Sequence, residues 1–216
     1  MTLVKHALLT TAILLTTHSM ASAAVVSFST AFGPTRTDFT TESLTLRSFD
    51  PTLGTLTSVQ LSLTGTGNFS GTVTNRGSTS ATFTLTENTT LTINSATAGL
   101  SGLNTNFSSS QTFTNLAPGT PASFGPFSPS NTTRATPGNL AAFQAGPLSF
   151  TASTLTGTAT SGAGGNVTTS FDTVASGVVA VTYTYDAPSA AVPEPASMAL
   201  LGVGLAGLGL IRRRKA

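Results

Sequence analysis

Apolar and polar residues alternate along many short stretches between residues 24 and 187, and this two-residue period predicts β-strands. Val59–Leu63 is the clearest case, because Val59, Leu61 and Leu63 share one face. Threonine, a β-branched residue that suits a pleated surface, fills many of the positions between the apolar ones. Further strands are expected at Val26–Phe28, Leu44–Leu46, Ala81–Leu85, Leu91–Ile93, around Phe107 and Phe113, and at Leu148–Phe150 and Val179–Tyr185.

Turn-forming residues separate these stretches, and no part of the region sustains a 3.6-residue apolar period. The pattern therefore predicts an all-β fold, a single antiparallel β-sandwich of the jelly-roll or immunoglobulin-like kind over residues 24–187. A short helix is expected at Asn139–Gln144, and the proline-rich stretch 117–138 is expected to be a long surface crossover between the sheets. Turns are expected at Asp50-Pro51, Thr66–Asn68, Asn75–Gly77, Pro118-Gly119, Pro137-Gly138 and Gly162–Asn166.

The N-terminal segment breaks the strand pattern. Lys5 and His6 precede an apolar stretch from Ala7 to Thr17, and Ala21 and Ala23 occupy the small-residue positions of a cleavage site. This order predicts a signal peptide over residues 1–23, export through the Sec machinery, and a mature chain that begins at Ala24. An uncleaved membrane anchor is the alternative, and the apolar stretch is short for it.

The C-terminal segment carries three features in order. Two prolines around an acid (Pro193, Glu194, Pro195) keep a helix from starting early, and an uncharged apolar run from Ala196 to Ile211 suits hydrocarbon. Four cations then mark the cytoplasmic side of a membrane, since they cross a bilayer only at high cost. They are Arg212, Arg213, Arg214 and Lys215. The sequence thus predicts a transmembrane helix whose end is held at the inner face.

This tail, residues 188–216 with its spacer, resembles the PEP-CTERM sorting signal of Gram-negative bacteria. The resemblance implies recognition by exosortase, a membrane-embedded cysteine transpeptidase, and cleavage near Pro193–Pro195. It also implies transient anchoring in the inner membrane followed by delivery to the cell surface or beyond, commonly in bacteria that make exopolysaccharide. A permanent anchor is the alternative, but the apolar run reaches only about 22–25 Å as a helix against a hydrocarbon core of about 30 Å.

The positive net charge of the whole chain comes from its two ends and does not describe the body. The chain is formally +2, but Lys5 and the four terminal cations lie in the ends. Residues 24–192 keep four arginines against six acids, which leaves −2, so nucleic acid is not an expected partner. These residues are Arg36, Arg47, Arg76 and Arg134, with Asp38, Glu42, Asp50, Glu87, Asp172 and Asp186.

The chemistry available to the body is narrow. The chain has no cysteine, and both histidines, His6 and His18, lie in the signal peptide. The body also lacks lysine. Nucleophiles paired with histidine, Schiff bases, disulfides and the usual zinc or copper sites therefore lack their residues. No catalytic residue, cofactor or metal site is expected.

Two minor possibilities for a site are kept. A carboxylate pair for glycan cleavage would come from Asp38 with Glu42, or from Asp172 with Asp186 if they meet across neighbouring strands. Oxygen ligands for calcium are scattered, without a clustered loop. Those residues are Asp50, Asn88, Asn166 and Asp172.

One stretch of the body resembles the signature of the choice-of-anchor E domain, a β-rich bacterial surface domain found ahead of different anchors. It runs from Ser48 to Leu63, with a turn at Asp50-Pro51, a close approach at Gly54 and a strand from Thr55. The resemblance implies a scaffold and adds no site.

Three functions follow from these observations. The first is a non-enzymatic surface or matrix protein, sorted by exosortase and associated with extracellular polysaccharide or biofilm. The second is a carbohydrate-binding module, although the body lacks tryptophan and its two tyrosines, Tyr183 and Tyr185, share one strand face that suits a core. The third is a glycan-cleaving enzyme that uses carboxylates.

We predict that the mature protein begins at Ala24, because Ala21 and Ala23 fill the two small-residue positions recognised before cleavage. N-terminal sequencing of the exported protein checks this. A sequence that starts before Ser22, or well after Val26, would contradict it.

Overall fold

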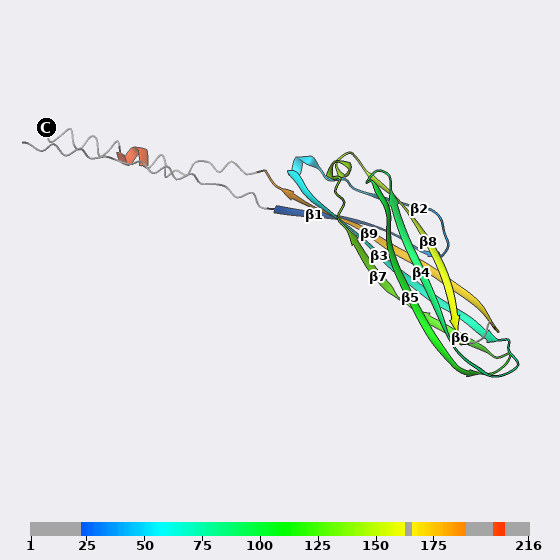
Figure 1. Ribbon diagram of the computed structural model, residues 1–216. Coiled ribbons are helices and arrows are strands. Elements are labelled where there is room, and N and C mark those ends of the chain that lie inside the picture. Colours follow the sequence, from blue (N-terminus) through cyan, green and yellow to red (C-terminus); the bar gives the residue numbers. More distant parts are fainter. Residues whose placement is uncertain (1–22, 163–165, 189–200, 206–216) are drawn as a thin grey trace, which may run out of the picture. The chain divides into compact units, whose positions relative to one another are not determined.

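The computed structural model describes residues 23–162, 166–188 and 201–205. Residues Ala23–Ala187 form one compact unit, the body, built almost entirely of strands. Figure 1 labels the strands in chain order. They are β1 (Ala23–Arg36), β2 (Glu42–Leu46), β3 (Thr55–Asn75), β4 (Ala81–Ser95), β5 (Leu100–Leu116), β6 (Pro121–Phe127), β7 (Ser130–Ala135), β8 (Leu148–Ser161) and β9 (Val167–Asp186).

The strands form two antiparallel sheets. The first has the order β1-β9-β3-β6, with β7 also paired to β3, and the second has the order β2-β8-β4-β5. The pairings nest along the chain: β4 pairs with β5, β3 with β6 and β7, β2 with β8, and β1 with β9. The body is therefore one long hairpin, turned at β4–β5 and rolled into two layers. The all-β, two-sheet prediction is confirmed.

Two predictions about local structure are wrong. The turn expected at Thr66–Asn68 lies inside β3, which continues to Asn75 because it pairs with β9 from Thr55 to Asn75. The crossover expected at 117–138 contains β6 and β7. Pro121 and Pro126 are tolerated in β6 because this strand lies at the edge of its sheet, where a missing N–H costs little.

Other local predictions are confirmed. The short helix is a 3-10 turn at Leu140–Phe143, and the Asp50-Pro51 turn is a 3-10 turn at Pro51–Leu53. The Asp50 side chain accepts hydrogen bonds from the Thr52 N–H (2.9 Å) and hydroxyl (2.7 Å), and these bonds lower the pKa of Asp50. Gly54 follows with a φ of 144°, so the chain closes tightly against Asp186 before β3 begins.

The inner faces of both sheets share one apolar core, as the alternating pattern requires. Tyr183 of β9 is fully buried against Phe49 and Phe143, with ring centroids 5.7 and 6.4 Å away. Its hydroxyl donates to the carbonyl oxygen of Arg47 at 2.8 Å, and burial raises its pKa to about 12. The prediction that Tyr183 belongs to the core is confirmed.

Glycines of the first sheet admit side chains of the second. Gly65 of β3 and Gly177 of β9 are register partners, so together they leave a hollow in the sheet. A Cβ on Gly65 would lie 2.6 Å from a ring carbon of Phe107 and 3.1 Å from Leu91. These glycines therefore set how closely the two sheets approach.

The core contains one fully buried carboxylate, Glu87 of β4. One of its oxygens, Oε1, accepts a hydrogen bond from the Thr173 hydroxyl on the opposite sheet, and Oε2 has no partner. Burial raises the pKa of Glu87, and the bond from Thr173 opposes that effect only in part. A group whose pKa is higher in the folded state stabilises the fold most at low pH, and this contribution is lost as pH rises through the raised value.

We predict that Gly65→Ala lowers the free energy of unfolding by about 1–3 kcal/mol, because the added carbon must displace the Phe107 ring. Gly157→Ala is the matched control, since a Cβ at Gly157 of β8 meets nothing within 4 Å. It should be neutral or slightly stabilising. Urea unfolding of residues 24–187 checks both variants, and equal effects would contradict the packing described.

We predict that Glu87→Gln raises the melting temperature at pH 7, because it removes a buried charge while leaving an oxygen for Thr173. The expected gain is at least about 2 °C, the shift that roughly 1 kcal/mol produces in a domain of this size. At pH 3.5 the gain should largely vanish, since Glu87 is then protonated in both states. Thermal melts of wild type and variant at both pH values check this, and a gain that does not depend on pH would refute it.

Candidate functional site

Most residues of the predicted sorting signals lie outside the described part of the chain. This is true of the signal peptide before Ala23, of Ala21, of Pro193, Glu194 and Pro195, and of the basic cluster Arg212–Lys215. Ala23 itself is the first residue of β1. Residues 201–205, within the apolar run predicted to span the membrane, are helical and exposed. Among the residues that are described, no helix is long and apolar enough to cross a membrane.

The two carboxylate pairs that were kept as minor possibilities do not share a site. Asp172 and Asp186 lie on the same strand, β9, so they do not meet across neighbouring strands. Asp38 and Glu42 have separate partners: Asp38 Oδ1 accepts from the Thr156 N–H at 2.7 Å, and Glu42 Oε1 from the Thr35 hydroxyl at 3.4 Å. Within the described ranges, no three acidic, histidine or cysteine residues gather where they could hold a metal ion.

The fold instead brings Asp38 to the same cleft as Glu87. The cleft, of about 330 Å³, opens between β8 of one sheet and β9 of the other, beside the end of β1. Glu87 forms part of its wall, where it is closed to solvent. The cleft is lined by Arg36, Thr37, Asp38, Glu87, Thr156, Thr158, Phe171 and Thr173.

The sequence pattern indicates that Glu87 is buried, although Glu87 was not among the acids considered for a site. In β4, Phe83, Leu85, Leu91 and Ile93 are buried in the core, and Glu87 falls in phase with them. A strand with alternate side chains on opposite faces must then place Glu87 inside. Its neighbour in register, Thr158 of β8, shares that face and reaches the cleft.

The segment that follows β1 crosses the rim of the cleft. Its backbone is held on both sides: the Thr37 N–H donates to the Thr173 carbonyl (3.1 Å), and the Asp38 N–H to the Thr154 hydroxyl (2.9 Å). Asp38 has a φ of 66°, an uncommon conformation for a residue with a side chain, which these bonds maintain. The segment thus fixes the Asp38 carboxylate at the rim.

An exposed ion pair lies next to this rim. Arg36 Nη2 is 2.7 Å from Asp172 Oδ1, and this hydrogen-bonded carboxylate raises the pKa of Arg36. Because both side chains are well exposed, solvent screens the pair and it adds little to stability. Its main effect on the cleft is that the one guanidinium in the lining is already neutralised, so Asp38 and Glu87 give the cleft an acidic character.

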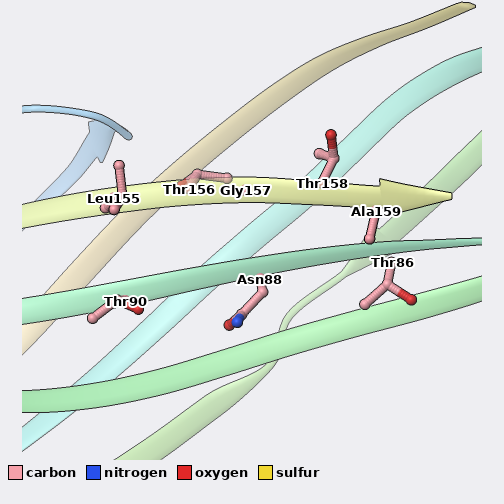
Figure 2. A pocket seen from close by; sticks show the side chains of 8 residues that line it. All are labelled: Thr86, Asn88, Thr90, Leu155, Thr156, Gly157, Thr158 and Ala159. Carbon is pink, nitrogen blue, oxygen red and sulfur yellow. The ribbon is translucent and has the colours of Figure 1, made fainter.

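A second depression, of about 520 Å³, lies on the outer face of the β2-β8-β4-β5 sheet. Figure 2 shows Thr86, Asn88 and Thr90 along β4, opposite the β8 residues Leu155–Ala159. Gly157 leaves the depression open because it has no side chain. The described walls contain no ionisable residue, so this groove presents only hydroxyl, amide and apolar groups.

Comparison with known proteins identifies the tail. A family model described as the PEP-CTERM protein-sorting motif matches residues 191–215. No curated protein matches the sequence. Among solved structures, a chain in "Structure of infectious bursal disease virus Gt strain" is 13% identical over 85% of this chain, with a TM-score of 0.12, too low to carry an argument. The present chain covers 47% of that viral chain.

The match falls on the segment in which Pro193–Pro195, the apolar run and the basic cluster were recognised from sequence. That part of the resemblance is confirmed, whereas the likeness of Ser48–Leu63 to the choice-of-anchor E domain stays a prediction. The motif implies export, processing by exosortase and a surface or extracellular location. The chain carries a PEP-CTERM protein-sorting motif at its C-terminus.

Proposed function

We propose that this chain is a non-enzymatic surface or matrix protein that exosortase releases from the inner membrane and that then associates with extracellular polysaccharide or biofilm. The observation that carries the proposal is the sorting motif at residues 191–215. The proposal includes export by Sec, transient anchoring through a helix over the apolar run, and processing near Pro193–Pro195.

The end of the body supports access by a processing enzyme. β9 ends at Asp186, and only six residues, Ala187–Val192, separate it from Pro193. This spacer is made of small residues and a proline, which suits an exposed extended segment. Ala23 and Asp186 are register partners, so the N-terminal and C-terminal signals both join the body at the same end of one sheet.

A non-enzymatic role is supported by what the body offers for chemistry. Residues 24–187 contain no histidine, cysteine or lysine, which removes the commonest nucleophiles and bases. Of the two acids at the cleft, Asp38 accepts a hydrogen bond from a backbone N–H through Oδ1, and Glu87 is closed to solvent. Carbohydrate binding is the second candidate, favoured by the hydroxyl-rich cleft beside these acids.

The proposal also covers the finer fold class, a jelly roll rather than an immunoglobulin-like sandwich. Support comes from the nested pairing, in which each strand on the way to β4 pairs with one on the way back from β5. A rolled hairpin of this kind gives the two Greek keys of a jelly roll. Since this architecture hosts many functions, it adds nothing to the functional argument by itself.

We predict that the tail controls the destination of the protein. Glu194→Ala should leave the protein held at the membrane but unprocessed, because one polar group at the outer boundary contributes little to insertion. Replacing Arg212, Arg213, Arg214 and Lys215 by glutamine should weaken retention, because their charges hold the C-terminus inside. Fractionation with size analysis, in a host with exosortase and in one without it, measures both effects.

Asp186→Asn is the matched control for Glu194, since it removes an acid just before the spacer. It should be processed like wild type. Identical processing in both hosts, or normal cleavage of the Glu194 variant, would replace the sorting signal with a plain membrane anchor.

A further inference from the structure

The cleft at Glu87 contains an acceptor without a partner. Glu87 is fully buried, yet its Oε2 accepts no hydrogen bond, while Oε1 is satisfied by Thr173. An unpaired buried carboxylate oxygen is costly, and most such groups in folded proteins are bonded. Because Glu87 lines the cleft, a donor that enters from the rim is the group that would satisfy it.

The chemistry of the lining selects among donors. Four threonines, at positions 37, 156, 158 and 173, line the cleft with Asp38 and Glu87. Arg36 is already paired with Asp172, so no free positive charge in the lining attracts an anion. The described acids do not form a group able to hold a metal ion. The cleft therefore suits a neutral ligand with several hydroxyl donors.

One aromatic side chain completes the lining. Phe171 of β9 is half-buried, and its ring packs edge-on against Phe124 at 5.5 Å, which fixes its orientation at the cleft. An aromatic ring provides a rigid apolar surface beside the polar groups. At about 330 Å³ the cleft is near the lower limit for small-molecule sites, a size that suits a single sugar ring rather than a long chain.

We propose that this cleft binds one neutral sugar unit of a polysaccharide, with Glu87 Oε2 and Asp38 accepting its hydroxyl hydrogens and Phe171 against its apolar face. This proposal rests on the proposed association with polysaccharide, and it names the cleft at Glu87 as the part of the body that makes the contact. The entering hydroxyl must displace whatever side-chain atoms of the lining now close Glu87 to solvent. The outer groove of Figure 2 is the competing surface, since it too presents hydroxyl and amide groups.

Calorimetric titration of the full-length protein in mild detergent tests the proposal. The neutral probes are cellohexaose, maltohexaose and the hexamer of N-acetylglucosamine, and the anionic probe is hexagalacturonate. At least one neutral probe should bind, in EDTA as well as in calcium, and hexagalacturonate should bind at least about tenfold more weakly, a difference of about 1.4 kcal/mol.

Variants locate the site. Thr37→Val keeps the shape of a half-buried side chain and removes a hydroxyl that lines the cleft but not the outer groove. It should weaken binding roughly 2- to 12-fold, as loss of one neutral hydrogen bond does. Thr86→Val makes the same change in the outer groove and should leave binding unchanged. Glu87→Met should weaken binding at least about tenfold while the protein melts at the same or a higher temperature, because an apolar chain replaces a buried charge.

Several outcomes would overturn the assignment. Binding lost in Thr86→Val and kept in Thr37→Val would move the site to the outer groove. Binding that needs calcium, that prefers hexagalacturonate, or that is absent for every neutral probe would refute the proposed chemistry. Release of reducing ends from a bound probe, lost in Glu87→Met, would make the cleft an active site. None of these results bears on processing of the tail, which the fractionation assay measures separately.

Discussion

The body depends above all on the position of its last strand, β9, which lies between β1 and β3 and pairs antiparallel with both. β9 pairs with β1 along one edge and with β3 along the other, from Thr55–Asp186 to Asn75–Val167. Without β9, β1 would have no partner in its sheet, and the core would lose Val179, Val181 and Tyr183, all fully buried. The sheet is therefore complete only when the chain has been made and exported up to the segment that precedes the sorting motif.

The same pairing explains how the sheets pack. Because Gly65 and Gly177 are partners in register, the hollow that they leave spans two strands, and Phe107, Phe32 and Leu91 approach it from the core side. Because the chain has no cysteine, the core has no disulfide and relies on close approach of backbone to aromatic rings. Glycine by itself weakens a strand, but a larger residue at either position has little room.

The cleft lies where one edge of β8 has no neighbouring strand. β2 pairs with β8 only from Leu148 to Ala152, so the second half of β8 lacks a strand on that side. The segment after β1 fills part of the gap through the Asp38 carboxylate and the Phe39 carbonyl, which accepts from the Thr154 N–H at 3.0 Å. The remaining opening leads toward Glu87. A binding function there would need no separate loop, because an unfinished sheet edge supplies the walls.

The sequence by itself determined the strand-rich body, its two-sheet class and the sorting motif, since these depend on local patterns: period-two alternation, turn residues, and proline, apolar and basic blocks in a fixed order. In the alternating pattern of β4, Glu87 falls on the same face as Leu85 and Leu91, and this position predicts that Glu87 is buried. Only the tertiary structure decided that β3 runs through Thr66–Asn68, that the proline-rich stretch forms two strands, and that Asp38 reaches Glu87's cleft. Each of these depends on a partner distant in sequence, and a single strand carries no information about which distant strand will satisfy its backbone.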